Sequence, residues 1–346
     1  MNLHKTADDL VAAIGGLYGD GTKFFRESTA GPPLSEVIAG TSVMPPHLED
    51  LVELCEEREF ETPATFGEFT ASARFTALRW NQATAPTLIY HHGSGESNYT
   101  ARIRRIVDQI DRVDVAQGGT ADPRSPVRQN NGGANIIVCS IPYNRNLKEY
   151  LAAAGRLDRW VFVLAASVRL TEVLTARLVE QGCARVVCAG ISLGGWITNL
   201  HHTYFDTCDA YCPIFAGAAL DDLFTESIYR KLLSSAATGA DEQFRGVLNF
   251  EADFTARGNG NVYPVMARHD QFIRFDRQAG IYRPEQMTVL ERSHTTGAVA
   301  YKHLARHLGT YLYDDSAGRE DAGHARTRGP QQLGGPQGRG PREGAI

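Results

Sequence analysis

The chain lacks the features that would suit it to nucleic acid, a bilayer or a structural metal. Its formal net charge is -5 and its pI is about 6.1, so no basic field is available to gather phosphates. No stretch approaches the roughly 18 uninterrupted apolar residues that cross a membrane. Among its six cysteines, Cys208 and Cys212 lie close together, but no second pair has zinc-ligand spacing. We therefore predict no nucleic-acid partner, no membrane span and no metal.

A secretory signal is also missing from the first 25 residues. Lys5, Asp8 and Asp9 interrupt the apolar residues there, and no apolar core leads to a small-residue cleavage site. Most of the cysteines lie inside apolar runs, where a thiol behaves as a small hydrophobe. We predict a cytoplasmic protein with free thiols.

What is present suits one large domain with extensions. The 346 residues are 42% hydrophobic and 22% charged, close to the average for soluble globular proteins. Residues 1–60 show helix-like apolar spacing broken at prolines, which predicts an N-terminal helical extension. The main domain is expected over residues 61–314. Residues 315–346 are rich in Gly, Pro and Arg, which predicts a disordered tail.

Within the main domain, short apolar runs alternate with helix-length segments, a pattern typical of a mostly parallel sheet covered on both faces. The predicted strands are residues 87–91, 135–141, 184–189, 210–215, 262–267 and 286–291. The predicted helices are residues 100–115, 147–181 with a break near Gly155, and 195–205. The pattern of residues 65–80 predicts a hairpin. Residues 217–260 are too long for a simple connection and predict a helical cap of about that extent.

The most informative segment is Gly-Ile-Ser-Leu-Gly at residues 190–194, which lies between a predicted strand and a predicted helix. Such a strand-to-helix turn is sharp enough to strain the serine and lift its hydroxyl above the sheet. Gly190 and Gly194 remove side chains that would collide with neighbouring backbone. The start of the helix favours developing negative charge. A plain turn is the alternative, but the strand before and the helix after favour Ser192 as a nucleophile.

This nucleophile elbow, together with a His-Gly loop at residues 92–96 after the strand 87–91, resembles the α/β-hydrolase family over residues 65–313. The resemblance implies a three-layer α/β/α sandwich with a mostly parallel sheet and a helical cap. It also implies an oxyanion hole made by the backbone of Gly93 or Ser94 and the N–H of Leu193. His91 and His92 could instead be metal ligands, but neighbours on a strand point to opposite faces.

The resemblance also implies a catalytic triad in the chain order Ser, acid, His. The base in this family follows the last strand, which points to His294, whereas His303 and His307 on the next helix are expected to be packed or solvated. The acid follows the preceding strand. Asp270 is our choice, and Asp276, six residues further on, is expected to serve a helix N-terminus instead.

The activity implied is that of a serine esterase: hydrolysis of a carboxylic ester, or a thioester, of a small acyl substrate through an acyl-enzyme. The resemblance implies no cofactor for this reaction. A non-catalytic small-molecule-binding protein on the same fold is the alternative. An interaction protein recruited through the arginine-containing tail is a third hypothesis that explains none of the motifs. Trp196 departs from the small residue that usually follows the elbow, and it is expected either in the core or in the pocket wall.

Overall fold

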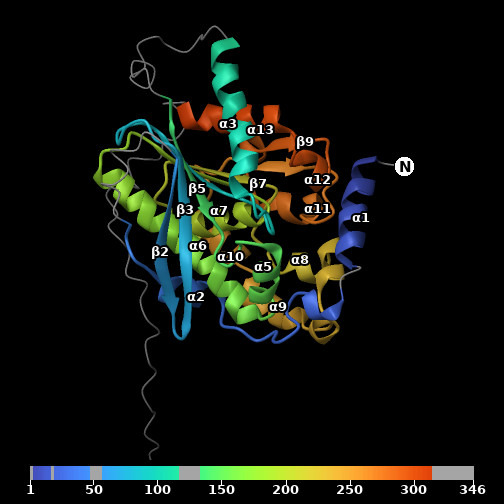
Figure 1. Cartoon of the computed structure of the whole chain (residues 1–346). Helices are drawn as coiled ribbons and strands as arrows, with labels where there is room; N and C mark the ends of the chain where they lie inside the picture. The colour runs from blue at the N-terminus through green and yellow to red at the C-terminus, as the bar shows by residue number, and fades with distance from the viewer. Residues whose placement is uncertain (1–2, 17–18, 47–56, 117–132, 314–346) are drawn as a thin grey trace, which may run out of the picture.

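The computed structural model describes residues 3–16, 19–46, 57–116 and 133–313, and its centre is a nine-stranded sheet (Figure 1). The strand order is β1-β2-β3-β5-β4-β6-β7-β8-β9. The antiparallel strands at one edge are β1 (Ser42–Val43), β2 (Arg58–Phe66) and β3 (Phe69–Arg79). The parallel strands are β4 (Thr87–His91), β5 (Asn135–Ser140), β6 (Val186–Ile191), β7 (Ala210–Ile214), β8 (Val265–Ala267) and β9 (Thr288–Leu290). Residues 314–346, including the predicted tail, lie outside the described part.

The central parallel strands are buried along their whole length. Every residue of β4, β5, β6 and β7 is buried, because helices cover both faces of a parallel sheet. This continuous burial explains why the strands occur in the sequence as unbroken apolar runs. The predicted strands at residues 87–91, 135–141, 184–189 and 210–215 are confirmed, while β8 and β9 are shorter than predicted.

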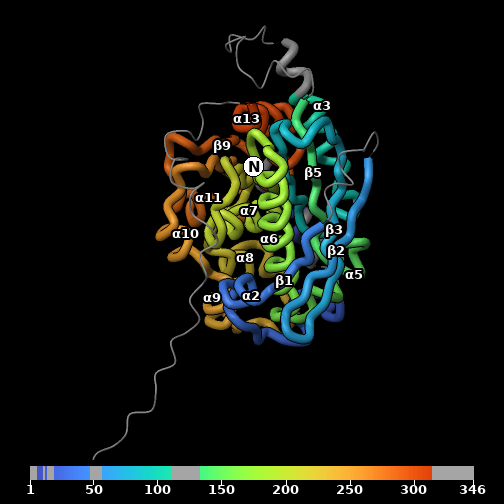
Figure 2. The backbone as a smooth tube through the Cα atoms, turned by 90° about the vertical axis from the view of Figure 1, so that its left-hand side faces the viewer, coloured from blue at the N-terminus to red at the C-terminus, as the bar shows by residue number. Residues whose placement is uncertain are grey.

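Two helix layers enclose the sheet. On one side α3 (Tyr99–Ala116) packs on α13 (Tyr301–Tyr313), and on the other α6 (Leu157–Glu180) packs on α7 (Leu193–Tyr204). The chain moves toward the β1 edge of the sheet when it crosses from β4 to β5. It moves toward the β9 edge when it crosses from β5 to β6 and from β6 to β7. Right-handed crossovers in opposite directions place their helices on opposite faces. Figure 2 looks onto the side that α6 covers. The predicted α/β/α architecture and the break near Gly155, between α5 (Leu147–Ala153) and α6, are confirmed.

The N-terminal segment is helical only in part. It contains α1 (Leu3–Gly16), the 3-10 turn η1 (Asp20–Thr22) and α2 (Leu34–Gly40), but then contributes β1 and the start of β2. The prediction that the hairpin begins at residue 65 is therefore wrong, since the pairing of β2 with β3 runs from Arg58 opposite Ala77 to a turn at Gly67. From Phe60 to Phe66, buried or half-buried residues alternate with exposed ones. Because Thr62 is buried and Pro63 is exposed, this period of two does not appear in the sequence as an alternation of apolar and polar residues.

Residues 217–260 lie between β7 and β8 as a series of short helices. They are α8 (Asp222–Thr225), η3 (Ile228–Leu232), η4 (Ser235–Ala237), α9 (Asp241–Leu248) and α10 (Glu251–Arg257). The N-terminal segment joins this insertion through backbone hydrogen bonds: the N–H of Phe24 donates to the carbonyl of Leu232 at 3.0 Å, and the N–H of Ser234 donates to the carbonyl of Phe24 at 3.1 Å. The two parts thus form one continuous cover.

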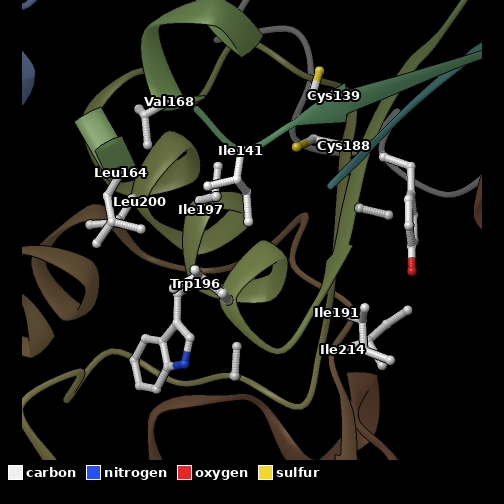
Figure 3. Packing of buried hydrophobic residues seen from close by; sticks show 14 of the residues in the cluster. Cys139, Ile141, Leu164, Val168, Cys188, Ile191, Trp196, Ile197, Leu200 and Ile214 are labelled. Carbon is white, nitrogen blue, oxygen red and sulfur yellow. The ribbon is translucent and has the colours of Figure 1, made fainter. Parts of the chain in front are cut away.

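The core beneath the nucleophile turn is filled by aliphatic and aromatic side chains (Figure 3). Trp196 is fully buried there and lies edge to face with Phe250, with ring centroids 6.2 Å apart. Trp196 therefore belongs to the core and not to the pocket wall. The cysteines at 139, 183, 188, 208 and 212 are free thiols, as predicted. In the part of the chain that the structure describes, no helix is both long and apolar enough to cross a membrane.

Candidate active site

Ser192 lies at the junction of β6 and α7 in a strained backbone conformation. Its φ of 56° and ψ of -118° are unusual for a residue with a side chain, and such conformations cost about 1–3 kcal/mol. The turn is held from both sides. The N–H of Ser192 donates to the carbonyl of Ile214 at 2.8 Å, and the carbonyl of Ser192 accepts from the N–H of Trp196 at 3.1 Å. Strain retained by surrounding hydrogen bonds is typical of a functional position.

The two flanking glycines are required by close backbone contacts. A Cβ on Gly190 would lie 2.3 Å from the carbonyl oxygen of Gly194, and a Cβ on Gly194 would lie 2.2 Å from the carbonyl oxygen of His91. Both distances are far inside van der Waals contact with backbone atoms that cannot move aside. The Gly-x-Ser-x-Gly spacing is therefore a packing requirement of this turn, as predicted from the sequence.

His294 lies within hydrogen-bond distance of Ser192. Its Nε2 lies 3.1 Å from the Ser192 Oγ. The prediction that His294 occupies a loop is wrong: it is the first residue of α12 (His294–Gly297), a single turn with a capping box between Ser293 and Thr296. The capped turn fixes the backbone of His294 more firmly than an open loop would.

Asp270 lies behind His294 and completes a chain of hydrogen bonds. Its Oδ2 is 2.7 Å from the His294 Nδ1, and its Oδ1 accepts the N–H groups of Phe272 and Ile273 at 2.9 and 2.7 Å. The carboxylate can only accept, so Nδ1 carries the imidazole proton and Nε2 is left to accept from the Ser192 hydroxyl. Asp276 instead lies in the first turn of α11 (Phe275–Gln278).

The charges around His294 raise its pKa. Burial of the ring works in the opposite direction and lowers the pKa, but the Asp270 carboxylate, its hydrogen bond and then the Asp8 carboxylate outweigh it, while Arg102 lowers it slightly. The net pKa of His294 lies above its ordinary value of 6.5. An opposite charge at hydrogen-bond distance stabilises the imidazolium, which is the form the ring takes after it accepts a proton.

His92 supports the loop beside the nucleophile and has no ring nitrogen left for a metal. Its Nε2 accepts the N–H of Ile141 at 3.0 Å, so the proton lies on Nδ1, which donates to the carbonyl of Gly93 at 2.7 Å. Burial lowers the pKa of His92 to about 4, which keeps the ring neutral at physiological pH. His91 bonds Thr171 on α6 instead, at 2.7 Å. The two rings therefore serve different neighbours, as expected of adjacent strand residues.

The other C-terminal histidines lie away from this chain of bonds. His307 is buried and its Nε2 donates to the carbonyl of Tyr263 at 2.9 Å, while His303 is exposed on α13. One is packed and one is solvated, as predicted.

Gly93, Ser94 and Leu193 line the same cavity as Ser192. A Cβ built on Gly93 would lie 3.6 Å from the Ser192 Cβ, so the loop after β4 lies directly against the serine. The Ser94 hydroxyl donates to the Tyr150 hydroxyl at 2.7 Å and so ties this loop to α5. Leu193 begins α7, where a backbone N–H has no partner within the helix. Among the described residues no acceptor bonds the N–H of Ser94 or Leu193.

Ser192 and His294 open into a cavity of about 540 Å³, within the roughly 300–1,000 Å³ usual for small-molecule sites. Its aromatic lining comes from segments far apart in the chain: Phe24, Tyr150, Trp160, Tyr229 and Phe272. Aliphatic side chains add to this wall: Leu147, Leu151, Leu193, Leu223, Leu232 and Val299. Leu147 and Val299 are 45% and 55% exposed, which places apolar side chains at the mouth of the cavity as well as inside it.

An ion pair forms the main polar part of the wall. The Arg102 Nε donates to the Glu96 Oε1 at 2.8 Å, and its guanidinium also donates to the carbonyl of Ala298. The pair ties the loop after β4 to the segment after α12. Lys23 adds a further cation to the lining, and the rest of the wall is mostly apolar.

Several of these residues were not predicted from the sequence. Phe24, Tyr150 and Trp160 lie outside any motif, and only the folded chain brings them to Ser192. Asp8 is another, since its carboxylate contacts the backbone of His294. Asp8 is buried on its helix while Leu10 is 62% exposed, and this reversal of the usual pattern is visible only in the folded chain. The sequence therefore held no signal for Asp8.

Comparisons with known proteins give no match by sequence and only distant matches among solved structures. No protein-family model and no curated protein matches the chain. The solved structures that are similar include an acylaminoacyl peptidase of Pyrococcus horikoshii (12% identity, TM-score 0.44, covering 75% of this chain and 41% of that one). Another is an acetyl xylan esterase of Thermoanaerobacterium (12% identity, TM-score 0.46, covering 82% of this chain and 97% of that one). A third is an esterase of Pyrobaculum calidifontis (11% identity, TM-score 0.44, covering 81% of this chain and 90% of that one). The chain thus spans about two fifths of the peptidase. The α/β-hydrolase fold itself rests on the strand order and the nucleophile turn described above.

Proposed function

We propose that the protein is a serine hydrolase that cleaves carboxylic esters carrying an apolar acyl group. The observation that carries this proposal is the chain of hydrogen bonds from Asp270 through His294 to Ser192, located at the floor of an apolar cavity. A binding protein would have no use for a strained serine paired with an oriented imidazole.

The reaction follows from the direction of these bonds. As the Ser192 Oγ attacks the ester carbonyl, His294 Nε2 takes the hydroxyl proton, and Asp270 stabilises the imidazolium. The tetrahedral oxyanion is stabilised by the N–H of Leu193 and that of Gly93 or Ser94, each such donor contributing about 2.7–4 kcal/mol. The imidazolium then gives its proton to the departing alkoxide, leaving the acyl group on Ser192. Water, deprotonated by His294, attacks this acyl-enzyme and releases the carboxylic acid.

The composition of the wall favours an ester over a peptide. Each residue of a peptide carries an N–H and a carbonyl that need hydrogen-bond partners once they leave water. The wall has much more apolar than polar surface. Among its polar side chains, the Ser94 hydroxyl is engaged with Tyr150 and the Glu96 Oε1 with Arg102. Lys23 and the Glu96 Oε2, which has no partner among the described residues, are too few to pair the groups of a peptide backbone. A hydrocarbon acyl chain needs no such partners and gains about 25 cal/mol for each Å² of apolar surface that it buries.

Active-site labelling tests the proposal directly. A fluorophosphonate probe should label the wild-type protein at Ser192, and the protein should hydrolyse p-nitrophenyl esters far faster than the matching p-nitroanilides. The measurement is peptide mapping of the adduct together with rates on an ester series of increasing acyl length. A protein that binds acyl esters but neither reacts with the probe nor turns them over is a binding protein, and the proposal fails. Faster cleavage of the anilides would identify an amidase.

The insertion is expected to set the acyl-length preference. Leu223 of α8 lines the cavity, so Leu223→Ala should raise the rate on long relative to short acyl esters by several-fold, since each buried CH₂ contributes about 0.8 kcal/mol. Leu233→Ala is the matched control, because Leu233 is 5% exposed against 7% for Leu223 but lies outside the cavity lining. The measurement is kcat/KM across the ester series. Unchanged relative rates in Leu223→Ala would show that the insertion does not select the substrate, and an equal shift in both variants would show that the effect does not come from the cavity wall.

A further inference from the structure

Asp8 is a buried carboxylate in the N-terminal segment of the chain. It lies on α1 with no exposed surface, although an ionised carboxylate is rarely buried without specific partners. Its neighbour in sequence, Asp9, is exposed. Burial of the one and not the other shows that the helix presents Asp8 to the interior. Figure 1 shows α1 beside α12, and the two helices are in contact.

The partners of Asp8 are backbone groups of the two segments that carry the proposed acid and base. Its Oδ2 accepts the N–H of His294 at 3.1 Å and that of Gln271 at 3.3 Å, and its Oδ1 accepts the N–H of Thr295 at 2.9 Å. Gln271 directly follows Asp270. One carboxylate thus joins the backbone beside the acid to the backbone of the base.

We infer that Asp8 is a positioning residue of the active site, which clamps the segments of Asp270 and His294 at the separation that proton transfer requires. This inference rests on the proposed function. Hydrogen bonds from N–H groups to an ionised acceptor are about twice as strong as neutral ones. Three of them on one carboxylate hold both segments against a single point, so the 2.7 Å contact between Asp270 and His294 depends on α1 as well as on the sheet.

The same charge also acts on the His294 imidazole. The charged groups that influence His294 are Asp270, Asp8 and Arg102, and the two carboxylates raise its pKa while the guanidinium lowers it. Removal of the Asp8 charge should therefore let the pKa of His294 fall. Since only the neutral imidazole can accept the serine proton, the acid limb of the activity profile should move to lower pH.

The Asp8→Asn variant separates positioning from simple anchoring of α1. It should lower kcat for ester hydrolysis by about 10- to 100-fold, the range expected from misplacement of reacting groups by up to an ångström. KM should change by less than about threefold, and the acid limb of kcat/KM should move to lower pH. Asp9→Asn, which makes the same change of charge one residue along the helix, should leave kcat and the acid limb of kcat/KM unchanged.

An anchoring role alone would lower the melting temperature of Asp8→Asn but leave kcat and the acid limb of the folded enzyme at their wild-type values, and that result would overturn the inference. The side-chain amide that Asp8→Asn introduces would place its N–H groups near backbone donors. Asp8→Ser therefore serves as a second neutral variant should Asp8→Asn not fold, with the same shift expected. If the wild-type protein hydrolysed no ester, the proposed function would be refuted. If the wild type were active and the Asp8 variants had the same kcat and acid limb, only the inference about Asp8 would be refuted.

Discussion

Ser192→Ala is expected to reduce kcat for ester hydrolysis by about 10⁴-fold or more, since loss of the nucleophile leaves only binding and oxyanion stabilisation. The fold should be retained. The change removes a hydroxyl whose hydrogen bond to His294 is 3.1 Å long, and such bonds contribute about 0.5–1.5 kcal/mol. The backbone strain at this position is the same for Ala as for Ser. The measurements are kcat on a p-nitrophenyl ester and the melting temperature.

Ser97→Ala provides the control for this loss. Ser97 is an exposed serine in the segment before α3 and contacts none of the residues placed in the reaction, so its variant should keep wild-type kcat and react with fluorophosphonate. Retention of more than a few per cent of turnover by Ser192→Ala, with the adduct found elsewhere, would assign the nucleophile to another residue.

The sequence predicts the parallel half of the fold well because its local signals agree with its tertiary context. The strand 87–91 is an unbroken apolar run and is buried on both faces as β4, and the glycines of residues 190–194 have no room for side chains. The antiparallel edge was placed less well. Its strands are partly exposed, and in β2 the buried Thr62 and the exposed Pro63 hide the period of two from the pattern of polar and apolar residues.

The candidate site was also predicted only in part: the sequence indicates the triad but not the cavity wall. Ser192, Asp270 and His294 each follow a strand that the sequence marks, so the resemblance to α/β hydrolases selects them without a structure. The cavity wall does not follow from any strand end. Phe24 reaches Ser192 only because backbone hydrogen bonds join it to the insertion, and no local pattern encodes such a contact between segments about 200 residues apart. The role of Asp8 depends on tertiary contacts of the same kind, which is why no motif predicted it.

Asp270→Asn should produce the second largest loss, about 10³- to 10⁴-fold in kcat, with much less effect on KM. An Asn side chain can donate its amide N–H to the His294 Nδ1, which would hold the imidazole with its proton on Nε2, facing the serine. That tautomer cannot accept the hydroxyl proton. The variant keeps the volume of the side chain and can still accept from Phe272 and Ile273, so the segment should retain its fold.

The pH profile identifies the acid independently of the size of the loss. In the wild type, kcat/KM should fall as the pH drops through a His294 pKa above 6.5, because the Asp270 carboxylate stabilises the imidazolium. Asp270→Asn removes that stabilisation, so the residual activity should keep its plateau to lower pH. Asp276→Asn, in the first turn of α11, should retain the wild-type profile and kcat within a few-fold. A severe kcat defect and a displaced acid limb in Asp276→Asn, with Asp270→Asn near wild type, would mean that Asp276 orients the base in solution.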